Sequence, residues 1–187
     1  MRWAVLYARS RQLPAAFAAL VVSTAVVWLL SRDDWALPQA LLALTASIAV
    51  AAIGLSGQDP DLDRTAALPW SRRRFAHLAL IGLASAGAVL AVQQLGPSAV
   101  DLSIILRDAA GLLGLTGLAA TTAGGQFGWT LPVAWSAVAL FVRNDGSTAS
   151  EIAAWMLQSA ETPVATWTAV LLAVTGTVAY TAWGGRR

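Results

Sequence analysis

Long apolar segments, separated by short polar ones, recur along the whole chain. A helix that crosses a membrane needs about 20 mostly apolar residues. Six segments meet this requirement and are predicted to be transmembrane helices: 14–31, 36–56, 75–95, 104–123, 126–142 and 163–183. Only Gly124 and Gly125 separate the fourth segment from the fifth. The pattern predicts an all-α integral membrane protein, with residues 1–187 forming a single transmembrane domain.

The composition points to the same class of protein. Of the 187 residues, 57% are hydrophobic and 12% are charged, and the mean hydropathy is +0.64. A soluble domain typically has about 45–50% apolar residues and about 25% charged residues. These values argue against a water-soluble enzyme with one buried core. The chain has no cysteine, which excludes disulfides, thiolate nucleophiles and cysteine-bound metals.

The charged residues exclude further chemistry. All 12 basic residues are arginine, and without lysine there is neither a P-loop motif nor a Schiff base. The net charge of +2 is too small and too dispersed to indicate nucleic-acid binding. Alternating aspartates at Asp59, Asp61 and Asp63 allow a divalent-ion site as a minor alternative. No nucleophile–base pair accompanies them, so neither an enzyme nor a metal site is predicted.

The arginines predict the orientation of the chain, because cytoplasmic loops are enriched in basic residues. With the N-terminus inside, the cytoplasmic side receives Arg2, Arg9, Arg11, Arg64, Arg72, Arg73, Arg74, Arg186 and Arg187. The other side receives only Arg32, Arg107 and Arg143. Both termini are therefore predicted to be cytoplasmic. Most tryptophans, Trp35 and Trp155 among them, fall near predicted helix ends, where indole rings serve as interface anchors.

The longest predicted cytoplasmic segment is the loop 57–74. Pro60 and Pro69 bracket residues 61–68, which predicts two helical turns between them. Ser71 is the predicted N-cap of the helix that follows. Two interpretations remain open: a solvated loop whose arginines contact anionic lipid headgroups, or a docking element for a cytoplasmic partner.

The run that leads into the third helix resembles the coupling helix of the ABC-2-type permease family of ATP-driven exporters. The matching positions are Asp61 or Asp63, Thr65, Leu68, Pro69, Ser71 and Arg72, and Arg64 lies among them in the predicted coupling segment. Arg64 departs from the family, which often has glycine there. The resemblance implies that this segment sits in a groove of a separate ABC ATPase subunit.

The resemblance implies a membrane-spanning permease subunit in a bacterial inner (cytoplasmic) membrane. Two permease subunits, identical or paralogous, would pair and contact membrane lipids. ATP and magnesium would be bound by the partner ATPase, with no cofactor and no enzymatic activity on this chain. The apolar helices favour a hydrophobic or amphipathic cargo, moved by alternating access.

The family implies two further features. A short interfacial helix is expected over residues 1–13, and residues 144–161 are expected to form a partly re-entrant hairpin that closes the outer mouth. A helix is predicted over Ser147–Ala160, because Thr148 and Glu151 form a capping box. Its predicted outer-gate residues share one face: Ile152, Trp155 and Met156. A plain surface helix is the alternative.

Chemistry inside the predicted bundle is sparse. Gly111, Gly114 and Gly117 lie close to one face of the fourth helix and predict close packing against another helix. Arg107 and Asp108 are neighbouring charges near lipid, where ionisable groups are costly. Because adjacent residues do not face each other on a helix, each is expected to find a partner on another helix, or water.

Two other functions remain as alternatives. The chain is also compatible with a substrate-binding membrane subunit of a vitamin-type importer, which would bind a polar small molecule saturably without a coupling helix. A non-transporting regulatory membrane subunit is the third possibility. Copurification of an ATPase would separate the first interpretation from both.

Overall fold

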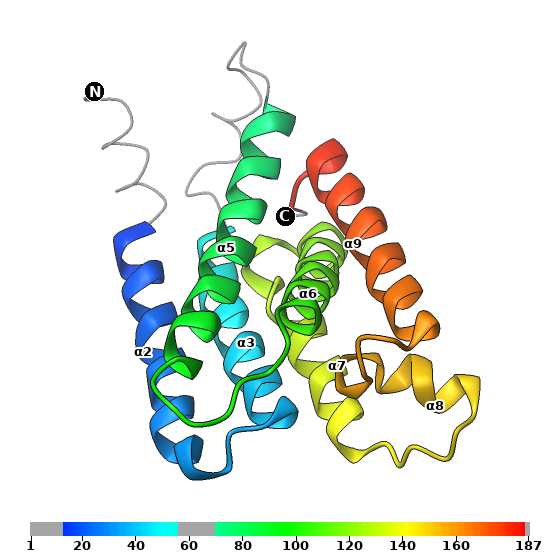
Figure 1. Ribbon diagram of the computed structural model, residues 1–187. Helices are drawn as coiled ribbons and strands as arrows, with labels where there is room; N and C mark the ends of the chain where they lie inside the picture. The colour runs from blue at the N-terminus through cyan, green and yellow to red at the C-terminus, as the bar shows by residue number, and fades with distance from the viewer. Residues whose placement is uncertain (1–12, 56–69, 186–187) are drawn as a thin grey trace.

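Apolar α-helices that run up and down form the part of the chain that the computed structural model describes, residues 13–55 and 70–185 (Figure 1). No strand occurs within these ranges. The α-helices are α2 (Leu13–Ser31), α3 (Leu37–Ala52), α5 (Trp70–Gln93), α6 (Leu102–Thr122), α7 (Thr130–Phe141), α8 (Thr148–Ala153) and α9 (Pro163–Trp183). Short 3-10 turns join them at η1 (Arg32–Asp34), η2 (Ile53–Leu55), η3 (Gly125–Phe127) and η4 (Trp155–Leu157).

Five helices are long and apolar enough to cross a membrane, as expected for a multi-pass membrane protein. Their candidate spans are Pro14–Asp34, Leu37–Leu55, Ser71–Gln93, Leu102–Thr122 and Pro163–Trp183. The last predicted segment, 163–183, coincides with α9. Pro163 at its first position favours the start of this helix, and Gly184, with φ 75°, ends it.

The fifth predicted segment, 126–142, differs from the structure. Its helix, α7, has 12 residues, which gives a length of about 18 Å against a hydrocarbon core of about 30 Å. The turn η3 precedes it, after Gly124 has taken a φ of 114°. A continuous helix from 126 is therefore wrong over its first turn, and residues 13–55 and 70–185 contain five candidate spanning helices rather than six.

The third predicted helix begins earlier than expected. α5 starts at Trp70 rather than at 75, so Ser71 lies inside its first turn and is not an N-cap. The interfacial helix predicted over residues 1–13 falls almost wholly outside the described residues. Residues 56–69, which hold most of the predicted coupling segment, also lie outside them.

The helix ends divide the described charges into two groups (Figure 1). At one end, here called the arginine end, α5 begins with Arg72, Arg73 and Arg74, and α9 finishes. The opposite end, here called the acidic end, holds the connections α2–α3, α5–α6 and α7–α9. All described acidic residues belong to these connections or to the start of α6: Asp33, Asp34, Asp101, Asp108, Asp145, Glu151 and Glu161.

α6 is the central helix and α2 is a peripheral one. In α6, 61% of the apolar stretch is buried inside the protein, against 11% in α2. α6 packs most extensively against α9, whereas α2 packs mainly on α3. Hydroxyl groups along these helices donate to carbonyls one turn earlier, as Thr24 does to Leu20 at 3.0 Å. Such bonds allow polar side chains to lie in an apolar environment.

Candidate functional site

The segment 143–162, here called the hairpin, folds back over the acidic end between α7 and α9 (Figure 1). Asn144 and Asp145 begin it, because their side-chain oxygens accept hydrogen bonds from the backbone amides of Gly146 and Ser147, each at 3.0 Å. The Ser147 side chain then caps α8 by accepting from the Ser150 amide at 3.2 Å. The predicted capping box at Thr148 is therefore wrong by one residue.

The predicted outer-gate residues do not share one face. Trp155 and Met156 are fully buried, whereas Ile152 is 40% exposed. The reason is the length of α8, which ends at Ala153 instead of continuing to Ala160. The 3-10 turn η4 then changes the angular spacing of the side chains. Two of the three predicted gate residues point into the bundle.

Trp155 fits into the side of α6 at a glycine. A Cβ atom added at Gly111 would overlap with the six-membered ring of the Trp155 indole. Gly111 therefore creates space for the hairpin rather than for a neighbouring spanning helix. Burial of Trp155, and of Trp35 at 4% exposed, also shows that these two indoles are not interface anchors as predicted.

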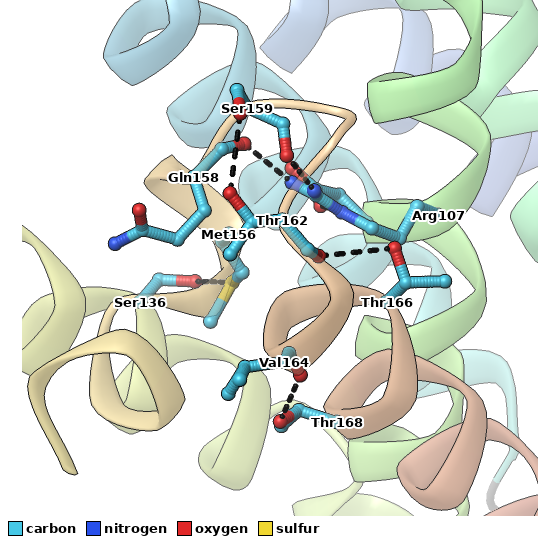
Figure 2. A network of polar contacts seen from close by, with 10 residues as sticks. Arg107, Ser136, Met156, Gln158, Ser159, Thr162, Val164, Thr166 and Thr168 are labelled. Carbon is cyan, nitrogen blue, oxygen red and sulfur yellow. Dashed lines mark hydrogen bonds and ion pairs between the residues drawn. The ribbon is translucent and has the colours of Figure 1, made fainter. Parts of the chain in front are cut away.

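Arg107 of α6 attaches this helix to the hairpin at the acidic end (Figure 2) and also forms a buried ion pair with Asp108. Arg107 Nε lies 2.9 Å from Asp108 Oδ1, and both side chains are at most 7% exposed. The two terminal nitrogens of Arg107 donate to the carbonyls of Ser159, at 2.9 Å, and Gln158, at 3.0 Å. Asp108 thus pairs with its neighbour, contrary to prediction, because the long Arg107 side chain folds back along the helix. Arg107 does bond outside α6, but to loop carbonyls that follow η4 rather than to another helix.

Two further contacts hold the hairpin against α7. Trp135 on α7 donates its indole N–H to the Ala153 carbonyl at 3.0 Å. Ser136 lies 3.7 Å from the Met156 sulfur (Figure 2) and shares a 2.8 Å hydrogen bond with Thr45 of α3. The hairpin is consequently bonded to α6 and α7 and linked through Ser136 to α3. Sequence patterns give no signal for this set, since its members lie far apart along the chain.

Gly114 and Gly117 have the packing role that was predicted for them. A Cβ atom at Gly114 would overlap with the Leu172 carbonyl of α9, and one at Gly117 would lie 2.5 Å from the Gly176 carbonyl oxygen. Gly176 in turn faces the Gly114 backbone. Small residues on both helices therefore let α6 and α9 approach closely.

Only two of the predicted coupling residues lie within the described ranges. Ser71 and Arg72 are exposed in the first turn of α5. The other six, which are Asp61, Asp63, Arg64, Thr65, Leu68 and Pro69, lie outside the described residues. Close by, a Cβ atom at Gly184 would lie 2.6 Å from Arg74 Cζ. Arg74 therefore sits at the C-terminal end of α9, where a cation complements the helix dipole.

Among residues 13–55 and 70–185, no cluster of three histidine, cysteine, aspartate or glutamate side chains could hold a metal ion. The apolar helices thus run between two different ends: the arginine end and the acidic end, which the hairpin covers. Comparison with protein-family models, with curated proteins and with solved structures finds no match to this chain.

Proposed function

We propose that the chain is the membrane-spanning permease subunit of an ABC transporter. It exports a hydrophobic or amphipathic substrate by alternating access, driven by a separate ATPase subunit that binds ATP and magnesium. The observation that carries the proposal is the run from Asp61 to Arg72, which resembles an ABC-2-type coupling helix and leads directly into α5. Two such subunits pair in a bacterial inner membrane.

The arginine end supports the proposal as the cytoplasmic side, because basic residues favour that side of a membrane. Arg72 is exposed there, at the end of the coupling segment. A displacement of this segment by the ATPase would act on α5, which packs against α2, α3, α6 and α9. One helix thus contacts most of the bundle, as rigid-body coupling requires.

The hairpin supports the proposal as the outer gate. It closes the acidic end with Trp155 seated at Gly111 and with Arg107 bonded to two hairpin carbonyls. Opening an outer path requires both contacts to break together, which gives a bistable element rather than a gradual one. Helices that bury few charges suit a cargo that is itself apolar over most of its surface.

The decisive experiment is purification of the chain from its native membrane in mild detergent, followed by identification of bound subunits and an assay of ATP hydrolysis. We expect a stoichiometric ABC ATPase whose hydrolysis is stimulated by the permease. Leu68→Glu together with Arg72→Glu should abolish this association while the protein remains inserted in the membrane.

The matched control is Arg143→Glu, the same charge reversal at an exposed residue of the acidic end. It should leave the ATPase bound and active. Unchanged association in the Leu68/Arg72 variant would remove the coupling role from this segment. A chain that lacks a nucleotide-binding partner and binds a polar small molecule saturably would instead be an importer's binding subunit. A chain that has no nucleotide-binding partner and binds no such molecule would be a regulatory subunit.

A further inference from the structure

Arg74 connects the first turns of α5 to the end of α9. A Cβ atom added at Gly184 would lie 2.6 Å from Arg74 Cζ, 2.8 Å from its Nη2 and 3.0 Å from its Nη1. A side chain at position 184 would therefore displace the guanidinium. Gly184 is buried, has a φ of 75°, and ends α9 by donating its N–H to the Tyr180 carbonyl at 2.8 Å. The contact thus depends on the side chain of Arg74 and on the absence of one at Gly184.

The residue after Gly184 contacts two further elements. A Cβ atom at Gly185 would lie 3.1 Å from the Gly125 nitrogen of η3 and 3.5 Å from the Ala120 carbonyl oxygen of α6. Gly184 and Gly185 are here called the glycine joint. This joint brings the beginning of α5 together with the last turns of α6 and α9 and with the turn that leads into α7.

The elements that meet at the glycine joint also support the hairpin at the opposite end. The hairpin connects α7 to α9, and Arg107 of α6 donates to its carbonyls at Gln158 and Ser159. The backbones of α6 and α9 are in contact, because Gly114 and Gly117 face α9 without a side chain between them. Close-packed protein interiors are hardly compressible and transmit strain. A displacement at the glycine joint therefore acts on the hairpin through α6 and α9.

We propose that Arg74 is a positioning residue that passes a displacement of α5 through the glycine joint to the hairpin. The inference rests on the proposed function, in which an ATPase displaces the segment before α5. Arg74 suits this role because it follows Arg72, the last predicted coupling residue, by two positions and lies half-buried against α9. Its cation also complements the C-terminal end of the α9 dipole, so charge and packing both favour the contact.

The test is limited proteolysis of the hairpin in the purified complex of permease and ATPase, with and without a non-hydrolysable ATP analogue. In the unmodified complex the analogue should speed cleavage within 143–162, because ATP binding opens the outer gate. Arg74→Gln should keep the ATPase bound and leave the nucleotide-free cleavage rate unchanged. It should reduce the acceleration by the analogue about two- to thirtyfold, the range found for single residues that modulate coupling between sites.

Arg74→Lys separates packing from charge. It keeps a cation at the end of α9 and should preserve the melting temperature, which shows that the chain is folded. An ammonium lacks the planar group that lies against Gly184, so the acceleration should still fall. Arg32→Gln is the control, since it makes the same change as Arg74→Gln at an exposed residue of the acidic end. It should respond to the analogue like the unmodified complex.

The outcomes that overturn the inference can be told apart from failure of the proposed function. An Arg74→Gln complex that responds fully to the analogue would remove Arg74 from the transmission, and one that loses the ATPase would make Arg74 a docking residue instead. Cleavage that is insensitive to the analogue in the unmodified complex would show that the glycine joint does not act on the hairpin. If no ATPase copurifies with the unmodified chain, the proposed function fails and the role of Arg74 fails with it.

Discussion

At the scale of single residues, the position of each glycine on α6 determines what can lie beside it. Gly114 contacts the backbone of α9 near Leu172, whereas Gly111, one turn earlier, receives the Trp155 ring. Between membrane helices the lipid is as apolar as the side chains, so tight packing supplies much of the association free energy. One glycine thus stabilises the α6–α9 pair, and another allows the hairpin to dock.

Gly114→Ala should destabilise the protein markedly. Its new methyl group would overlap with the Leu172 carbonyl, a backbone group that can move only if α6 and α9 separate. Overpacking of this kind costs about 1–3 kcal/mol of unfolding free energy, which lowers the melting temperature measured in detergent.

Gly87→Ala is the matched control, because a Cβ atom at this exposed glycine of α5 meets nothing within 4 Å. Removing glycine from a helix there should raise the unfolding free energy by about 0.4–1 kcal/mol. Equal melting temperatures for the two variants would contradict the close approach of α6 and α9.

Asp145 gives a pH prediction in the turn that starts the hairpin. Hydrogen bonds from Ser147, first from its side chain and then from its backbone amide, lower the pKa of the exposed Asp145 carboxyl from 3.8 to about 2. Because the folded pKa lies below the unfolded one, the turn is stabilised above about pH 4. This stabilisation is lost as the pH falls through the folded pKa.

Carboxyl carbon NMR should find the Asp145 midpoint near pH 2. Ser147→Ala removes the side-chain donor but keeps the amide, so its midpoint should move part of the way back toward 3.8. A wild-type midpoint already at 3.8 would show that these hydrogen bonds do not form in solution.

At the scale of elements, Arg107 links the hairpin to α6 while it forms a buried ion pair with Asp108 of the same helix. Arg107→Gln should cost about 3–5 kcal/mol of unfolding free energy, because it leaves the buried Asp108 carboxylate without its partner. It also removes two donors to the hairpin carbonyls. Both a lower melting temperature and faster proteolysis within 143–162 are therefore expected.

Replacing both charges separates these two effects. An Arg107→Met, Asp108→Leu double variant leaves no unpaired charge, so its melting temperature should return close to that of the unmodified chain. Its hairpin should still be cleaved faster, since the bonds to Gln158 and Ser159 remain absent. If cleavage returned to the unmodified rate, the contacts of Trp155 and Met156 and the Trp135–Ala153 hydrogen bond would suffice to hold the hairpin.

The elements that could be predicted from the sequence are those with a complete local signal. Long apolar runs bounded by proline or charge gave α2, α3, α5, α6 and α9, because about 20 such residues have few other stable states in lipid. α7 was predicted too long. The apolar composition of 126–142 does not reveal that Gly124 adopts a positive φ and that a 3-10 turn, η3, follows it. The hairpin was only partly predictable. Its helix was expected to continue to Ala160, but α8 ends at Ala153, and Ile152 is exposed while Trp155 and Met156 are buried.

At the scale of the whole molecule, the number of membrane crossings depends on whether the short helix α7 is part of a sixth crossing. Its 12 residues cannot cross a membrane alone. Figure 1 nevertheless shows the chain running from the arginine end of α6 to the hairpin at the acidic end, through η3 and α7. At about 2 Å per residue for the 3-10 turn and 1.5 Å for the helix, η3 and α7 together reach about 24 Å. We expect this stretch to cross as a broken helix, because α9 then runs from the acidic end back to the arginine end.

This topology predicts which residues are reached from each side of the membrane. The chain has no native cysteine, so single cysteines at Gln126 and Gly146, both exposed, report directly on the two ends of the broken helix. A membrane-impermeant maleimide applied outside intact cells should label Gly146→Cys and leave Gln126→Cys unlabelled until the cells are opened. Arg72→Cys, at the start of α5, should behave like Gln126→Cys because both lie at the arginine end. Labelling of both Gln126→Cys and Gly146→Cys from one side would mean that α7 enters and leaves the same face, and that only five segments cross.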